Sequence, residues 1–490
     1  MPYTGPLRSV SALVVTTALV AVLSLSAGPA VAADAPWSAP VEITDSYGDA
    51  NATVVAPDGT ITVVSETPSG IVTSSSTDAG LTWGPSVLAG SGGDYAVRPA
   101  VGVTSSGLLA AAWVESLNAV RTIRVAISAD RGATWSTPQT LPAVSSDVDD
   151  PVVASVSASA YTIAWNEGPD KYSTISVDGG ATWSAPQVIT QNMNSSNNAD
   201  LVPVGGGAIV VLFQEFDGQT GRRSIQSERS TDGGATWGPK VIVGTDWSGS
   251  FGQSFYTYGV SPADGTLVAV WSRGTGNGDA LFAATSTDGG ATWAQQFGVS
   301  PEVDKLRYFT VKAVSTTAVG ILWHYATLDN AILSYSTATV GASDVSAPVT
   351  IATSPTLAFD RLPAFSTLGD VRVASWGEFT RNSPTSGFRT SVSCDAGATW
   401  STPAVLAIGQ IARTDAQTSV SRGIFAAYWH QRTAGPSGES LYASTLSGAC
   451  GHVIPALAAT GAPLAPTGIL ALVIVALGAG LVVLRRRSAV

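Results

Sequence analysis

Eight polar or phenolic residues recur along the chain at intervals of roughly fifty positions, and their types are those that bind or process ligands. In most units this residue stands fifteen positions before a recurring aromatic residue, and in the fourth unit the separation is thirteen. An arginine can hold a carboxylate through two hydrogen bonds, an aspartate can act as acid or base, and a tyrosine can stack on a ring or act as nucleophile. The column consists of Asp49, Arg98, Asp150, Asp200, Tyr256, Tyr308, Arg361 and Thr414.

Two interpretations of this column stay open at the level of sequence. In the first, Arg98 and Arg361 hold a ligand carboxylate, one of the aspartates supplies or takes a proton, and Tyr256, Tyr258 or Tyr308 contacts the ligand ring. In the second, neighbours such as Asp49, Arg98 and Asp150 neutralise one another across adjacent repeat units. Both interpretations require that the column lie on one repeated frame.

A second repeat supplies that frame. The phrase Ser-x-Asp-x-Gly-x-Thr-Trp occurs six times, with successive aspartates in the first five copies separated by 52, 48, 54 and 56 positions. It predicts a tight hairpin loop in which the carboxylate accepts backbone N–H groups, glycine allows positive φ, and a buried Trp packs against the sheet. The expected role of these aspartates is structural. They are Asp78, Asp130, Asp178, Asp232, Asp288 and Asp395.

Each unit contains three β-rich runs before the phrase and one after it, which is typical of a four-stranded antiparallel propeller blade. In the second unit the expected strands are residues 98–104, 108–115, 122–128 and 135–141. Degenerate copies near Ser336 and Ser444 bring the count to eight blades, or fewer if a degenerate unit is not a blade. The run from Trp37 to Val41 resembles a fourth strand without its preceding phrase, so we expect the N-terminal strand to close the ring in this all-β propeller.

The second expected strands carry an aromatic column, followed two positions later in several units by Glu. A single Trp-x-Glu could stack on a sugar beside an acid, but its repetition favours packing and hydrogen bonding within the frame. The aromatic residues are Trp113, Trp165, Phe213, Trp271, Trp323, Trp376 and Trp429, and the glutamates are Glu66, Glu115, Glu167, Glu215 and Glu378.

The repeated phrase resembles the Asp box of bacterial sialidases and related propellers. The resemblance covers nearly the whole body of the chain and implies a sialic-acid site with three arginines, a Tyr assisted by Glu as nucleophile, and an Asp as general acid. Sialidases have six blades, and their Arg-Ile-Pro signature is absent here. The nearest sequences are Arg98-Pro99 and Arg361-Leu362-Pro363, with Arg307 or Arg413 as a possible third arginine.

Both ends of the chain carry expected targeting signals. Residues 1–32 have an apolar run and end in Ala30-Val31-Ala32, which predicts a secretory signal peptide. Near the other end, Leu457, Thr460 and Gly461 belong to a Leu-Ala-x-Thr-Gly sequence that resembles an actinobacterial sortase substrate, with cleavage expected after Thr460. The similar sequence from Leu464 to Gly468 ranks second, and an intact membrane anchor is the alternative. We therefore expect a propeller at 33–450, a tail at 451–490, and attachment to the wall or membrane of a Gram-positive cell.

The composition agrees with an exported, folded chain. Hydrophobic residues make up 45% and charged residues 12%, while the net charge of −11 argues against a nucleic-acid partner. Cys394 and Cys450 are expected on the same face of neighbouring blades, where export permits a disulfide. No motif requires a metal or an organic cofactor, although calcium at loop aspartates stays open.

Two functions are compatible with these features, and we expect a monomer in either case. The first is a cell-surface propeller that binds a glycan or a protein at the mouth formed by the innermost strands, with sortase as a partner during anchoring. The second is an exo-sialidase or related exo-glycosidase that uses the arginine, aspartate and tyrosine column.

Overall fold

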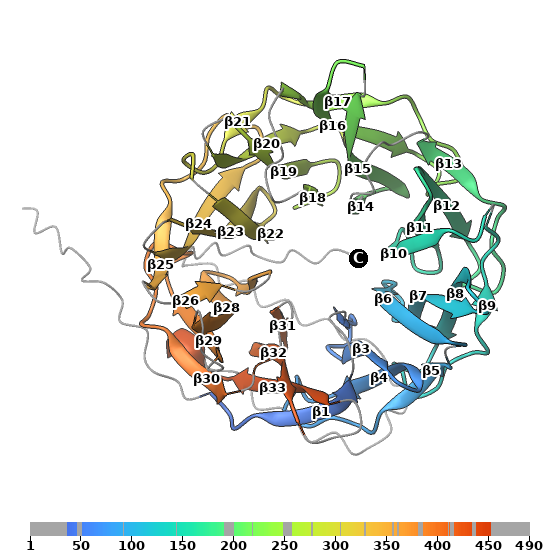
Figure 1. Cartoon of the computed structure of the whole chain (residues 1–490), viewed down its shortest axis with the longest axis horizontal. Coiled ribbons are helices and arrows are strands. Elements are labelled where there is room, and N and C mark those ends of the chain that lie inside the picture. Colours follow the sequence, from blue (N-terminus) through green and yellow to red (C-terminus); the bar gives the residue numbers. More distant parts are fainter. Residues whose placement is uncertain are drawn as a thin grey trace, which may run out of the picture. The chain divides into compact units, whose positions relative to one another are not determined.

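The computed structural model describes residues 37–451, except 47–50, 92, 144, 191–199, 218, 248–256, 276–277, 304, 328–329, 355–356, 360–361, 381–385, 410, 412–415 and 434–437. These residues belong to one compact unit that spans Met1–Ile454. Within it the strands form eight antiparallel sheets arranged as the blades of a ring (Figure 1). The prediction of an eight-bladed, all-β propeller is therefore confirmed.

The first four blades follow the chain in order, each from its innermost to its outermost strand. Blades 1 and 2 consist of β2 (Asn51–Val55), β3 (Ile61–Thr67), β4 (Gly70–Ser76), β5 (Val87–Gly90), β6 (Tyr95–Val103), β7 (Leu109–Leu117), β8 (Val120–Ser128) and β9 (Gln139–Thr140). Blades 3 and 4 consist of β10 (Val148–Ser155), β11 (Tyr161–Glu167), β12 (Asp170–Ser176), β13 (Gln187–Thr190), β14 (Asp200–Gly205), β15 (Ala208–Asp217), β16 (Arg222–Ser230) and β17 (Val241–Trp247).

The other four blades include the two whose repeated phrase is degenerate. Blades 5 and 6 consist of β18 (Thr257–Val260), β19 (Leu267–Gly274), β20 (Asp279–Ser286), β21 (Phe297–Gly298), β22 (Lys305–Ser315), β23 (Ala318–Ala326), β24 (Ala331–Thr339) and β25 (Val349–Ser354). Blade 7 has β26 (Leu357–Phe359), β27 (Ala364–Leu368), β28 (Val371–Thr380), β29 (Ser386–Ser393) and β30 (Ala404–Gly409), and its two inner segments both pair with β28.

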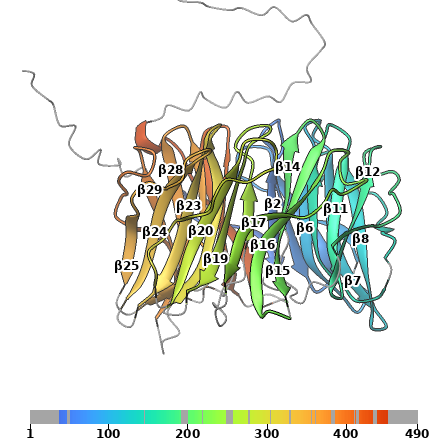
Figure 2. The same cartoon turned by 90° about the horizontal axis from the view of Figure 1, so that it is seen from above.

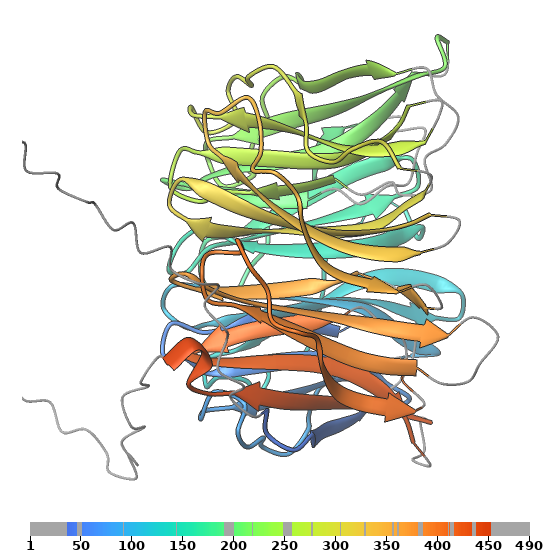
Figure 3. The same ribbon diagram turned by 90° about the vertical axis from the view of Figure 1, so that its left-hand side faces the viewer.

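Blade 8 closes the ring as the sequence predicts. It consists of β31 (Gln417–Ser421), β32 (Ile424–Arg432), β33 (Glu439–Leu446) and, as its outermost strand, β1 (Val41–Ser46). The N-terminal strand pairs antiparallel with β33, and Ser38 N–H donates to the carbonyl of Thr445 at 2.8 Å. The ring is thus completed within the described residues, and a short 3-10 helix, η1 (Ala449–Gly451), follows the last strand (Figure 3).

The hydrophobic core lies between blades, because strands buried on both faces carry nearly continuous apolar runs. The aromatic column of the second strands is at most 1% exposed in every member from Trp113 to Trp429. Trp113, for example, packs against Val64, Ile71 and Ala89 of the preceding blade. Its ring occupies the space above Gly90, where a Cβ would lie 2.3 Å from the indole. This column is therefore structural.

Two expectations about the repeat require correction. The fourth strand of blade 2 begins at Gln139, not at Trp135, since Pro138 has no N–H to donate to the ladder. The Trp residues that end the repeated phrase are half-buried, not fully buried. Three of the indole groups hydrogen-bond to the preceding blade, those of Trp135, Trp237 and Trp293. Trp237 Nε1, for example, donates to Ser173 Oγ at 2.9 Å. They stabilise the contact between blades as well as their own hairpin.

Candidate functional site

The two faces of the ring differ in chemistry, and strand direction defines them. The innermost strands all begin at one face, here called the mouth face, which also carries the hairpins between second and third strands. The repeated loops follow the third strands and so lie on the opposite face, here called the box face. Figure 2 shows the strands running between these two faces.

On the mouth face, the innermost strands of blades 2 and 3 are interrupted at equivalent places. The pairing register shifts between Val97 and Ala100 in β6 and between Asp149 and Val152 in β10. Arg98-Pro99 and Asp150-Pro151 occupy these bulges, because proline cannot donate to the ladder. Arg98 has φ 56° and Asp150 has φ 48°. Such left-handed conformations cost about 1–3 kcal/mol in non-glycine residues and are concentrated at functional sites.

Hydrogen bonds from the backbone to carboxylates hold both bulges. Glu66 of blade 1 accepts the backbone N–H of Arg98 at 2.5 Å, and Asp149 Oδ1 accepts the N–H of Asp150 at 2.9 Å. Two other glutamates of the same column accept an indole N–H group, Glu167 from Trp165 at 3.0 Å and Glu378 from Trp376 at 2.8 Å. The recurring Trp-x-Glu is therefore part of the frame, as its repetition suggests.

Six side chains form a connected network between blades 2 and 3, here called the Arg98 cluster: Arg98, Arg121, Asp149, Asp150, Asn166 and Lys171. Arg98 Nη1 contacts Asp149 Oδ1 at 2.7 Å and Asp150 Oδ1 at 2.6 Å. Arg121 Nη2 reaches the same Asp149 oxygen at 2.9 Å. The side chain of Arg98 is 47% exposed and that of Asp150 31%, so the network is open to solvent at this end. Of the predicted column, the structure brings Arg98 and Asp150 together.

The inner end of the Arg98 cluster is buried. Lys171 in β12 is 1% exposed, and its Nζ donates to Asn166 Oδ1 at 2.6 Å. Asn166 Nδ2 in turn donates to Asp150 Oδ2 at 3.3 Å. Burial lowers the pKa of Lys171 to about 8, against the opposing effect of the Asp150 charge. A lysine thus supports the exposed ion pair from inside the blade.

Sequence reasoning missed Arg121, Asp149, Asn166 and Lys171, although a signal for Lys171 exists. Twelve positions before the Trp of the repeated phrase, five other units have apolar residues that are at most 2% exposed, and the third unit has Lys171. A cation in an apolar core column is costly and therefore marks a special site. The five apolar residues are Ile71, Ile123, Ile225, Leu281 and Phe388.

Asp200, at the start of β14, is set apart from the Arg98 cluster by its surroundings. Burial raises the pKa of its carboxyl group to about 6. The hydrogen bond from Gly259 N–H, 2.8 Å from Oδ2, opposes that shift. A carboxyl group with this pKa can exchange a proton near neutral pH.

The tyrosines near the starts of β18 and β22 are half-buried. Tyr258 meets the buried Phe309 of the next blade edge-to-face at 5.1 Å between ring centroids, and Tyr308 lies 5.6 Å from the ring of His324. Tyr95, at the start of β6, is 47% exposed. Phenolic rings thus lie near the inner-strand starts of three blades.

Several residues of the predicted site lie outside the described residues. These are Asp49, Tyr256, Arg361, Thr414 and Arg413, and nothing is described of the side chain of Arg307. The sorting residues Leu457, Thr460 and Gly461 and the signal peptide are likewise outside them. Their roles remain predictions.

The six repeated loops share one hydrogen-bonding arrangement. In the copy at Asp178, the carboxylate accepts from Ser176 Oγ at 2.8 Å, from Thr182 N at 2.9 Å and from Thr182 Oγ1 at 2.6 Å. These bonds, that from the Thr182 hydroxyl most of all, lower the pKa of Asp178 to about 2. Both carboxylate oxygens serve the turn, which supports a structural role for this column.

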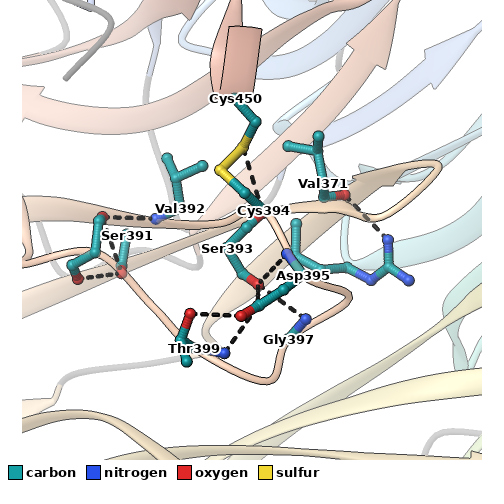
Figure 4. Close-up of a disulfide and its surroundings, with 11 residues drawn as sticks. Val371, Ser391, Val392, Ser393, Cys394, Asp395, Gly397, Thr399 and Cys450 are labelled. Atoms are coloured by element: carbon teal, nitrogen blue, oxygen red, sulfur yellow. Dashed lines mark hydrogen bonds between the residues drawn. A yellow bond between two sulfur atoms is a disulfide. The ribbon is translucent and has the colours of Figure 1, made fainter. Parts of the chain in front are cut away.

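Cys394 and Cys450 form a disulfide on the box face (Figure 4). Cys394 belongs to the repeated loop of blade 7, next to Asp395, and Cys450 lies in η1 after the last strand of blade 8. Their Cα atoms are 5.5 Å apart. The bond therefore joins the end of the closing blade to its neighbour.

The described residues contain neither a metal-binding group nor a membrane-spanning helix. Among the described residues, no group of three or more His, Cys, Asp or Glu side chains is placed to hold a metal ion. In the same part of the chain, no helix is long and apolar enough to cross a membrane.

No protein-family model and no curated protein matches the chain. Solved structures aligned with it include a polysaccharide lyase, PL25 ulvan lyase, at 14% identity over 76% of this chain and 96% of that chain, with a TM-score of 0.46. An α-L-arabinofuranosidase from Fusarium graminearum aligns at 15% identity over 59% of this chain and 92% of its own, with a TM-score of 0.40. The NanB sialidase from Streptococcus pneumoniae aligns at 10% identity over 83% of this chain and 69% of its own, with a TM-score of 0.38.

Proposed function

We propose that the chain is an exported, surface-attached propeller, with its body at 33–450, that binds glycans on its mouth face. The observation that carries the proposal is the Arg98 cluster, because it combines exposed charged groups, strained backbone and a buried supporting lysine. Sugar hydroxyls require such closely spaced donors and acceptors, and the exposed Tyr95 of the same strand, β6, offers an apolar ring face with a polar edge.

The positions at which the described part of the ring begins and ends support surface display. Trp37 precedes β1 and η1 follows β33, and both lie on the box face because of the direction of these two strands. An anchor at the predicted sorting sequence would continue from that face and leave the mouth face free for a ligand. In this proposal the protein acts as a monomer, and sortase is a partner only during attachment.

An exo-glycosidase of the sialidase type is the second candidate. It is favoured by Asp200, since a carboxyl group with a pKa of about 6 suits a general acid. Asp49, Asp150, Tyr256 and Arg361 would be the other participants expected from the sequence.

Both candidates can be tested with the soluble segment from Ala33 to Pro455, which contains the closed ring. Its binding to immobilised glycans would be measured for the wild type and for Arg98→Ala. Arg131→Ala is a matched control, because Arg131 also has positive φ and pairs with Asp58, but on the box face. The proposal is supported if the wild type and Arg131→Ala bind the immobilised glycans and Arg98→Ala does not. Failure of the folded protein to bind any glycan overturns it.

Hydrolysis of a fluorogenic sialoside is the parallel experiment for the second candidate. Turnover that disappears in Arg361→Ala and falls in Asp200→Asn would establish the enzyme. If the protein binds glycans but does not hydrolyse the sialoside, the glycan-binding propeller is the function supported.

A further inference from the structure

We infer that the Arg98 cluster selects neutral glycans over acidic ones. This inference rests on the proposed function and concerns the ligand class of the same site. Its basis is the charge already present on both sides of Arg98.

The guanidinium group of Arg98 is already paired with carboxylates of the chain, whereas binding a ligand carboxylate would require it to be free. Its Nη1 contacts two carboxylates of the chain itself, from Asp149 and Asp150, at 2.7 and 2.6 Å. A carboxylate from a ligand approaching the remaining Nη2 and Nε would face these two like charges at close range. Like charges so placed disfavour binding, and this repulsion acts in the opposite direction to the attraction of the guanidinium.

The second arginine is neutralised in the same way. Arg121 Nη2 contacts Asp149 Oδ1 at 2.9 Å, and Glu66 accepts the backbone N–H of Arg98 at 2.5 Å. The positive charges of this region, on Arg98, Arg121 and Lys171, are therefore equal in number to its carboxylates. These carboxylates belong to Asp149, Asp150 and Glu66. No cation of the cluster is left without a carboxylate or amide oxygen to accept from it.

What the network leaves available suits hydroxyl groups. Among the described residues, no hydrogen bond involves Arg98 Nε or Nη2, and none involves Asp149 Oδ2, whereas Arg98 Nη1 and Asp149 Oδ1 are engaged. A sugar hydroxyl can accept from a guanidinium N–H and donate to a carboxylate oxygen at once. Neighbouring hydroxyls of a neutral sugar therefore match the alternation of donor and acceptor on this surface.

The test uses an array on which each neutral glycan is paired with its sialylated or uronate-bearing counterpart. We expect the Ala33–Pro455 segment to bind the neutral member of a pair about tenfold or more tightly. Preference for the acidic member overturns the inference and leaves the proposed function intact. If no member of any pair binds to the folded protein, the proposed function itself fails.

Variants that remove one negative charge test the cause. Asp150→Asn and Asp149→Asn preserve the shape of the side chain, and each is expected to weaken the preference for neutral glycans by about tenfold. Asp58→Asn, which alters the matched ion pair on the box face, should leave the preference unchanged. Thermal melting verifies that each variant is folded, and Asp149→Asn serves if Asp150→Asn unfolds. An unchanged preference in a folded variant contradicts the charge argument.

Discussion

The ammonium group of Lys171 donates to Asn166 Oδ1 at 2.6 Å inside a column that five other blades fill with apolar side chains. Lys171 is 1% exposed. Asn166, which accepts from it, donates in turn to Asp150. Natural proteins retain such a costly group where it serves a site, at the expense of stability.

Lys171→Ile is therefore expected to stabilise the fold and to weaken ligand binding. Burial lowers the pKa of Lys171 from 10.5 to about 8, so the folded state binds the proton less well than the unfolded state. The free-energy cost of burying the charged ammonium is present in full below pH 8. It decreases as the pH rises toward 10.5, because stability increases with pH where the unfolded state binds more protons than the folded state. Replacement should add about 2–3 kcal/mol to the free energy of unfolding at pH 7 and less at pH 10. Urea titration at both pH values measures this, and a destabilised variant at pH 7 would contradict the prediction.

Trp237→Ala should destabilise the contact between blades 3 and 4. The half-buried indole packs against this interface and donates to Ser173 Oγ at 2.9 Å. We expect a loss of about 2–3 kcal/mol, less than for a fully buried Trp. Ser173→Ala should cost about 1 kcal/mol, and the double variant should cost less than the sum of the two. Additive effects in thermal or urea unfolding would show that the hydrogen bond contributes nothing.

Gly90→Ala should destabilise the ring by overpacking. A Cβ at this position would lie 2.3 Å from the buried indole of Trp113, and insertion into a packed core costs about 1–3 kcal/mol. Gly298→Ala, on the outermost strand of blade 5, is the control, since no described atom beyond its chain neighbours lies within 4 Å of its Cβ position. Equal melting temperatures for the two variants would contradict the close packing of Gly90 with Trp113.

Loss of the disulfide should weaken the closing blade. The bond joins Cys394 and Cys450 across a separation of 56 residues, and its removal is expected to cost about 2–4 kcal/mol through the entropy of the unfolded chain. Replacement of both cysteines by serine, followed by urea unfolding, measures the effect. Mass spectrometry without reductant provides the direct check, and two free thiols would contradict the pairing.

The fold was accessible from sequence because its signal is local and repeated. The Ser-x-Asp-x-Gly-x-Thr-Trp loop depends on bonds within five residues, such as those from Thr182 to Asp178, so each copy carries its own turn information. The strand periodicity and the unmatched run at Trp37 then determined eight blades and the closure of the ring. The buried aromatic column followed from the same repetition.

The site depended on contacts that sequence spacing does not reveal. Spacing placed Arg98 and Asp150 in one column, but only the assembled blades show Asp149 and Arg121 completing the ion pairs, because these residues come from different strands of two adjacent blades. The depth at which Lys171 lies, and the half-burial of the Trp residues in the repeated loops, likewise depend on how neighbouring blades pack. Sequence alone determined the repeated frame, through local hydrogen bonding and periodic burial. Tertiary structure decided the charge balance of the mouth face, because electrostatic interactions depend on the distances between charges on neighbouring blades.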